Sequence, residues 1–235
     1  MLLSLEPLPY LDIHTHRKDQ KSDFVSVFSL SSNELLSDDS LPQSLFTAGI
    51  HPWWLEDLSS SEISSLKIRI EELLAKGALW GIGETGIDRA YPELLETQIE
   101  LFNWHLELSE KFNLPLVIHN VKAGSDFLQI LKDKRPKSPW IFHDFRGNES
   151  LMKDLLRLHS KCFFSFGLSI DNSQQIRDLI PLVPLDRLFL ETDEQKHLDI
   201  QEIYLRASHF LQMDLDLLKS QIWLNFRGLN TKPTH

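Results

Sequence analysis

The stretch LDIHTH, residues 11–16, lies in the first of eight short apolar runs in this 235-residue sequence and ends in two histidines one residue apart. Runs of this length that are rich in Val, Ile, Leu and Phe are typical of buried strands. The sequence therefore predicts strands at YLDI (10–13), FVSVFSL (24–30), FTAGI (46–50), ALWGIG (78–83), PLVIH (115–119), WIFH (140–143), CFFSFG (162–167) and RLFLE (187–191).

Amphipathic segments with a period near 3.6 residues separate the later runs and predict helices. They cover residues 60–76, 94–112, 123–133, 148–158, 173–180, 199–212 and 214–224. Ser59 with Glu62 three residues later, Asn148 and Ser173 mark helix starts. Eight strands that alternate with helices indicate an α/β protein, and they favour a closed (β/α)₈ TIM-type barrel over an open sheet. No glycine-rich phosphate loop follows the first strand, which argues against a dinucleotide-binding sheet.

The connection between the first two predicted strands is unusually short. Only RKDQKS (17–22) separates the two runs, whereas a helical crossover needs about 10–12 residues. We therefore expect the first helix of the barrel to be missing or reduced. No linker or low-complexity tract interrupts the chain, so we expect residues 1–235 to form a single domain.

Composition narrows the possible partners and location. The sequence has 24 Lys and Arg against 34 Asp and Glu, a net charge of -10, so a phosphate-bearing ligand needs a locally positive site. One cysteine, Cys162, excludes an internal disulfide and indicates a reducing cytoplasm. The N-terminal residues lack a basic segment typical of a signal peptide, and no apolar run approaches the roughly 20 residues that span a bilayer. We expect no membrane partner and favour a monomer.

Metal-competent side chains stand at the carboxyl ends of the predicted strands. Residues two apart in a strand point to the same side, so His14 and His16 share a direction with Asp12, which we expect to orient one imidazole. Barrel enzymes keep their sites at this end of the strands. The remaining candidates at strand ends are Glu84, His119, His143 and Asp193. The alternative, that these buried polar residues merely pair with one another, requires all six to gather there by chance.

Four imidazoles and two carboxylates suit a centre with two divalent metal ions. Glu84 can bridge two ions about 3.5–4 Å apart, and Asp193 can act as the general base that takes a proton from water. The nitrogen and oxygen ligands fit Zn, Mn, Fe or Mg. Two such ions against two carboxylates would leave the pocket with about two positive charges, enough to attract phosphate.

The motifs LDIHTH, GIHPWW, GIGETGID, LPLVIHN, WIFHDFRG and LFLETD, in this order from residue 11 to residue 193, resemble those of the TatD family, and NFRG near residue 225 resembles its last helix region. The resemblance implies a metal-dependent hydrolase on a (β/α)₈ barrel, usually a deoxyribonuclease that trims DNA ends. It also implies one ion held by His14, His16, Glu84 and Asp193, and a second held by Glu84, His119 and His143.

The sequence departs from the family pattern where the family contacts its substrate. Val121 stands where the family usually has an arginine, EQKHLDIQ (194–201) replaces a substrate loop, and the segment before GIHP is short. The metal ligands are all present. The expected substrate is a phosphate-containing molecule, with single-stranded DNA ends as the family-derived choice.

Other residues near the strand ends are candidates for weaker roles. His51, Arg146 and Arg89 are the candidate substrate contacts, the two arginines as replacements for the missing phosphate clamp. We expect Trp53 and Trp54 to pack beneath their loop rather than stack on a base. Asp88 is interpreted as a loop cap or a partner of a metal ligand, and His105 as a partnered histidine rather than a ligand.

Two further functions remain open at this stage. The same centre can hydrolyse a carboxyl ester, lactone or amide, as related barrels do. A protein of another class is also possible, one that holds metal but no longer cleaves nucleic acid.

Overall fold

The computed structural model describes residues 8–17, 23–37, 41–195 and 197–229. Its strands pair in parallel and in chain order, each with the next along the sequence. They are β1 (Tyr10–Thr15), β2 (Phe24–Ser29), β3 (Leu45–Ala48), β4 (Gly81–Asp88), β5 (Leu116–Val121), β6 (Trp140–Phe142), β7 (Cys162–Phe166) and β8 (Leu188–Leu190).

The two ends of the sheet meet where β1 lies against the end of β8. The amide of Asp193 donates to the carbonyl of His14 at 3.0 Å, and the amide of His16 donates to the carbonyl of Asp193 at 3.2 Å. Thr15 and Asp193 form a parallel bridge. These contacts complete the barrel, and the predicted (β/α)₈ fold is confirmed.

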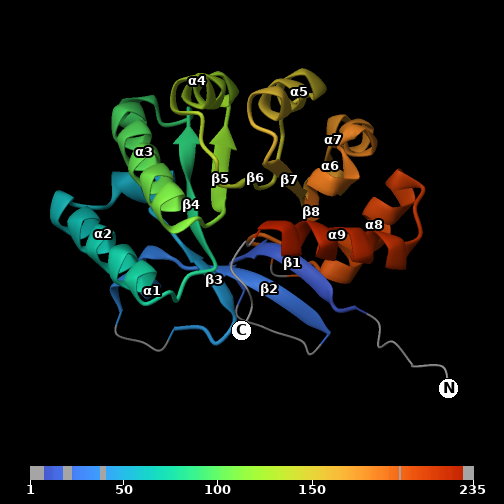
Figure 1. The fold of residues 1–235 in the computed structure, drawn as a ribbon, viewed down its shortest axis with the longest axis horizontal. Helices are drawn as coiled ribbons and strands as arrows, with labels where there is room; N and C mark the ends of the chain where they lie inside the picture. The colour runs from blue at the N-terminus through green and yellow to red at the C-terminus, as the bar shows by residue number, and fades with distance from the viewer. Residues whose placement is uncertain (1–7, 18–22, 38–40, 196, 230–235) are drawn as a thin grey trace.

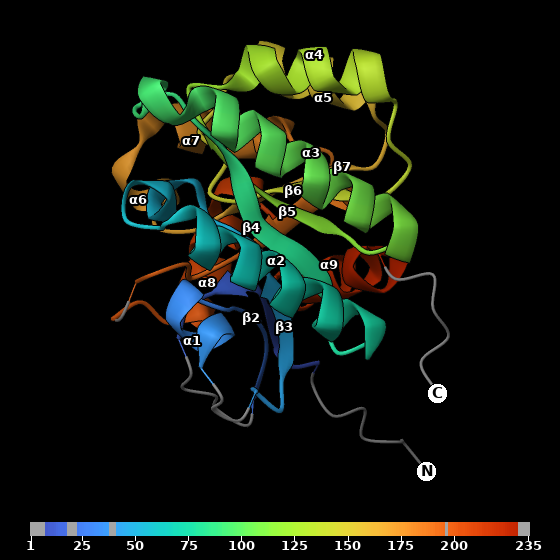
Figure 2. The ribbon, with the colours of Figure 1, turned by 90° about the vertical axis from the view of Figure 1, so that its left-hand side faces the viewer.

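Helices lie outside the strands on several sides, as Figure 1 shows. They are α1 (Ser32–Leu36), α2 (Ser60–Ala75), α3 (Leu95–Phe112), α4 (Gly124–Lys134), α5 (Glu149–Leu158), α6 (Ser169–Asn172), α7 (Gln174–Leu179), α8 (Ile200–Leu211) and α9 (Leu215–Leu229). Short 3₁₀ helices are η1 (Pro52–Glu56), η2 (Pro92–Leu94), η3 (Ile180–Leu182) and η4 (Leu185–Arg187). Figure 2 shows α2 and α3 lying across the outer side of β4.

The local signals for helix starts are confirmed. Ser59 and Glu62 form a capping box at α2, and the side chains of Asn148 and Ser173 cap α5 and α7. Between β1 and β2 the described residues form no helix, while residues 18–22 lie outside the description. The five-residue α1 follows β2 instead. No helix among the described residues has both the length and the apolarity needed to cross a bilayer.

Strand β4 runs from Gly81 to Asp88 and not over the predicted range of 78–83, so Gly86 also belongs to the strand. Gly83 has a φ of 131°, which only glycine adopts readily, and a Cβ added at Gly86 would collide with the carbonyl oxygen of His119. The glycines thus let β4 lie close against β5. Glu84 consequently stands within the strand and not after it, between the paired residues Ile82 and Thr85.

His105 of α3 ties this helix to the barrel and is fully buried. Its Nε2 accepts the amide of Ile50 at 3.1 Å, while its Nδ1 lies 2.7 Å from the carbonyl of Leu101 and 3.0 Å from Thr85 Oγ1. The expected partnered histidine is confirmed. Burial lowers the pKa of His105 from 6.5 to about 3, so the ring stays neutral and Nε2 keeps its acceptor role.

His105 should make stability fall in mild acid. Between pH 6.5 and pH 3, His105 binds a proton in the unfolded chain but not in the folded protein. The free energy of unfolding therefore decreases as the pH falls below 6.5. We expect His105 to account for a loss of about 3 kcal/mol in unfolding free energy between pH 6.5 and 4. Urea unfolding of His105→Gln at the two pH values should show a smaller loss than the parent, with the exposed His209→Gln as control. Equal losses in all three proteins would contradict this assignment.

Candidate metal centre

The six predicted ligands meet at the carboxyl ends of the strands. They come from elements far apart in sequence: His14 and His16 from β1 and its end, Glu84 from β4, His119 from β5, and His143 and Asp193 from the ends of β6 and β8. Barrel closure and strand pairing bring them to one rim, where the Glu84 carboxylate is their shared neighbour.

One Glu84 oxygen faces the two histidines of LDIHTH. Glu84 Oε2 lies 3.3 Å from His14 Nε2 and 3.5 Å from His16 Nε2. Asp193 Oδ1 lies 3.7 Å from the first of these nitrogens and 3.6 Å from the second. His14, His16 and Asp193 can offer ligand atoms within 4.8 Å of one another. Two imidazoles and two carboxylates thus surround one position.

The other Glu84 oxygen is surrounded by three imidazoles. Glu84 Oε1 lies 2.7 Å from His143 Nε2, 2.8 Å from His119 Nδ1 and 2.9 Å from His51 Nε2. The burial of Glu84 opposes its ionisation, but His143, His51 and the hydrogen bonds from the neighbouring rings hold its pKa well below the usual range. The centre therefore contains an ionised carboxylate that can bind a cation.

Two buried carboxylates lie beside the outer ring nitrogens of His119 and His143. His119 Nε2 lies 3.3 Å from Asp88 Oδ2, and His143 Nδ1 lies 3.4 Å from Glu191 Oε1. With a cation bound, a proton held toward each outer carboxylate would leave His119 Nδ1 and His143 Nε2 with lone pairs for that cation; without one, these nitrogens carry the protons that are donated to Glu84. This is the usual support of a metal-ligating histidine. Asp88 also accepts the amide of Ala90 at 2.8 Å, as expected of a loop cap, and its role as the partner of a metal ligand stays a prediction.

Glu191 is a member of the site that the sequence reasoning missed. It is fully buried, accepts the amide of Asp144 at 2.8 Å and is contacted by the hydroxyl of Ser165. The signal was present, since Glu191 stands two residues before Asp193 and can therefore share its side of the chain.

His14 supplies a direct test of whether a cation fits. Its side chain is fully buried, and neither ring nitrogen has a hydrogen-bond partner among the described residues. Buried imidazole nitrogens are normally satisfied, so an unpartnered one that faces two carboxylates is suited to a cation. The donor set of imidazole and carboxylate groups fits a divalent ion of the Zn, Mn, Fe or Mg type.

Asp12 does not orient an imidazole, contrary to the sequence prediction. Its Oδ1 accepts the amide of Thr192 at 3.0 Å and its Oδ2 accepts the Thr192 hydroxyl at 2.6 Å. Closure of the barrel places these donors beside it, so Asp12 joins β1 to the residues that follow β8. Burial raises the pKa of Asp12 to about 7 despite the Thr192 donors.

His51 is held as a hydrogen-bond donor. Its Nδ1 accepts the amide of Trp53 at 3.0 Å, so the ring proton lies on Nε2, which points at Glu84 Oε1. Burial lowers the pKa of His51, although Glu84 opposes this. A neutral donor at the edge of the centre is suited to an anionic oxygen of a substrate.

Trp53 corrects the expectation that both tryptophans pack beneath their loop. Its side chain is 45% exposed and lines the cavity over the centre, while its Nε1 donates to Asp88 Oδ2 at 2.7 Å. Because Asp88 is buried beside His119, this hydrogen bond fixes the position of the indole next to the centre. Trp54 is half-buried against the core.

The cavity over the centre has a volume of about 670 Å³, which suits a small organic ligand. Arg146 and Lys122 line it. Val121, which stands where the family usually has an arginine, also lines it. Arg89 instead forms a two-pronged pair with Asp126, at 2.6 and 2.7 Å, and is absent from the lining. Of the two candidate arginines, only Arg146 is placed to contact a bound molecule.

Comparison with known proteins gives consistent results. The profile of the TatD related DNase family matches residues 12–229. The metal-dependent hydrolase YcfH of Escherichia coli K12 is 32% identical over 151 residues, which cover 63% of this chain and 55% of YcfH. The 3′-5′ ssDNA/RNA exonuclease TatD of Erwinia amylovora is 32% identical over 159 residues, which cover 63% of this chain and 56% of that protein.

A solved structure supports the fold over a greater length. The TatD homologue YjjV of Escherichia coli K12 superimposes with a TM-score of 0.78 at 19% identity, over 95% of this chain and 98% of that one. By sequence, the match to YcfH spans about half the length of that relative.

Cation binding at Glu84 should stabilise the folded protein. An ion present at 100 times its Kd adds about 2.7 kcal/mol to the unfolding free energy, or about 5–10 °C in Tm for a chain of this size. We expect Mn²⁺ to raise the Tm of the chelator-treated protein by this amount and to have little effect on Glu84→Gln. Glu107→Gln, an exposed change on α3, should behave like the parent. An undiminished Mn²⁺ effect in Glu84→Gln would contradict the assignment.

Proposed function

Because this chain belongs to the TatD related DNase family, we propose that it is a divalent-metal-dependent hydrolase that cleaves phosphodiester bonds at the ends of single-stranded DNA. The observation that carries the proposal is the convergence of His14, His16, His119 and His143 on the two oxygens of one buried carboxylate. In a protein without a cation, so many imidazoles have no reason to gather there.

The proposed centre holds two ions, with Glu84 shared between them. His14, His16, Glu84 and Asp193 would hold one, and Glu84, His119 and His143 the other. The arrangement of the two Glu84 oxygens supports this division, because each oxygen faces a different set of imidazoles. When bound, the ions supply Lewis acidity, which neutralises charge on phosphate oxygens and acidifies water.

The residues of the chain supply the proton transfer and the positioning. Water attacks phosphorus, Asp193 accepts the proton of the water, and the bond from phosphorus to the leaving sugar oxygen breaks as that oxygen takes the proton back from Asp193. Asp193 suits this role because its backbone is fixed on both sides to β1, while its side chain is 27% exposed at the cavity wall. His51 Nε2 would donate to a phosphate oxygen as negative charge develops there, in place of its contact with Glu84 Oε1 at 2.9 Å.

The substrate class follows from the cavity and from the family. Exposed Trp53 offers a face for stacking on an unpaired base, which contributes about 1–3 kcal/mol. The net charge of -10 gives little attraction to a long duplex, so short or single-stranded ends are favoured. The Erwinia relative is named as an exonuclease of single-stranded DNA and RNA. The single free cysteine fits the proposed cytoplasmic setting.

A carboxyl ester, lactone or amide is the second candidate substrate class. The observation that favours it is Val121, an apolar side chain in the cavity wall where the family usually has an arginine. A substrate with less negative charge than a phosphodiester needs fewer cationic contacts, and the same centre would activate water for it.

Cleavage of an end-labelled single-stranded oligonucleotide in the presence of Mn²⁺ tests the proposal. We expect Asp193→Asn to lower kcat by at least about 100-fold, the usual effect of losing a general base. Asp133→Asn, an exposed change on α4, should retain full activity. Turnover of p-nitrophenyl acetate or a lactone without any oligonucleotide cleavage would shift the assignment to the second class. Bound Mn²⁺ without turnover of any of these substrates would overturn both.

A further inference from the structure

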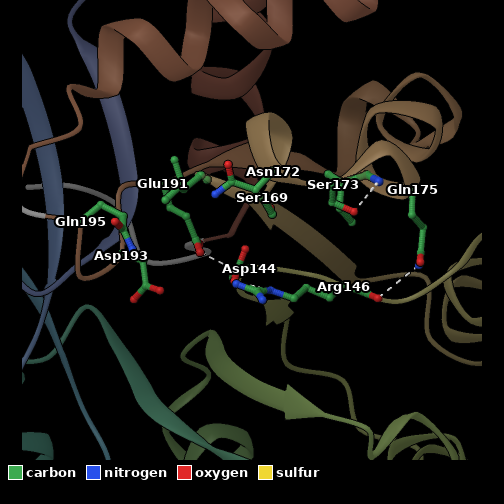
Figure 3. A pocket seen from close by; sticks show the side chains of 12 residues that line it. Asp144, Arg146, Ser169, Asn172, Ser173, Gln175, Glu191, Asp193 and Gln195 are labelled. Carbon is green, nitrogen blue, oxygen red and sulfur yellow. Dashed lines mark hydrogen bonds and ion pairs between the residues drawn. The ribbon is translucent and has the colours of Figure 1, made fainter.

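A second cavity adjoins the metal centre on the side of β7. Its volume is about 330 Å³, and Asp144, Arg146 and Asp193 line both it and the main cavity. Figure 3 shows its walls, which come from the β6–α5 loop, the residues after β7 and the residues after β8. We call the pocket around Ser169, Asn172 and Gln195 the β7 subsite. A molecule bound at the centre can thus extend into either of two hollows.

The β7 subsite contains a buried hydroxyl with no partner. Ser169 is 6% exposed, lines the cavity, and its Oγ has no hydrogen-bond partner among the described residues. Buried polar groups are normally satisfied, so this hydroxyl calls for a partner from outside the chain. Asn172 and Gln195 add amide groups to the same lining.

The chemistry of the lining differs from that of the main cavity. None of the twelve described residues that line the β7 subsite is aromatic, so it offers no stacking surface for a base. Its cation is Arg146, which already pairs with Asp144 at 2.5 and 2.8 Å. Hydroxyl and amide groups beside Leu168 and Ile176 suit an uncharged ring that carries hydroxyl and ether oxygens, as a sugar does.

We propose that the β7 subsite binds the sugar of one nucleotide that flanks the scissile phosphate, with Ser169 Oγ and the Asn172 amide hydrogen-bonded to sugar oxygens. The nucleoside on the other side of the phosphate lies in the main cavity against Trp53. This inference rests on the proposed phosphodiesterase function and adds to it a residue-level account of how the substrate is divided between two cavities.

Steady-state kinetics of Ser169→Ala with Mn²⁺ tests the proposal on two substrates. The dinucleotide dTpdT has a sugar on each side of the phosphate, while bis(p-nitrophenyl) phosphate is a phosphodiester without sugars. We expect KM for dTpdT to rise about 3- to 10-fold with kcat nearly unchanged, the effect of losing one hydrogen bond to a substrate. The kinetics on the aryl ester and the Tm should match those of the parent. Asn172→Ala should act in the same direction, and the exposed Ser64→Ala should change nothing.

Each other outcome has a definite meaning. An equal loss on both substrates would show that Ser169 only supports the centre, and an unchanged KM for dTpdT would show that no sugar binds there; either result overturns the inference and leaves the proposed function intact. If the parent protein cleaves neither phosphodiester, the proposed function fails and the inference fails with it.

Discussion

The buried carboxylate of Glu84 is the constraint on which the rest of the structure depends. A charge removed from water is costly unless it is paired, and in this protein the pairing comes from imidazoles on β1, β5 and the ends of β3 and β6. Each of these elements must reach the same rim for Glu84 to be satisfied. This requirement accounts for the glycines of β4, because only a strand without side chains at Gly83 and Gly86 can lie so close to β5.

Much of the fold was predictable because strands and helices here obey simple periodicities. The eight apolar runs, the caps at Ser59, Asn148 and Ser173 and the lack of a helix among the described residues between β1 and β2 all follow from local rules. The extent of β4 did not, because glycines that permit close strand contact look in sequence like those of a turn. The gathering of His14, His119 and Asp193 was anticipated from their places at strand ends.

The hydrogen-bond and ion-pair partners that lie on distant strands of the barrel could not be predicted from the sequence. Alternation indicates the side on which Asp12 lies, but only closure against β8 shows that Thr192 satisfies it. Glu191 was overlooked because its role depends on the ring of His143, almost fifty positions away. The exposure of Trp53 was missed for the same reason, since its hydrogen bond to Asp88 holds it out of the core. Asp88 and Glu191 also offset the positive charge expected of the loaded pocket, and Arg146 is paired with Asp144, which leaves Lys122 as the local attraction for an anion.

The joint between β1 and Asp193 has a consequence for the timing of activity. Its halves are separated by about 180 positions, so a growing polypeptide would carry His14 and His16 for most of its synthesis without Asp193. Contacts of such long range form late in folding. A nascent chain on the ribosome, or a fragment cut before β8, would therefore lack the proposed hydrolase activity, which requires a nearly complete chain.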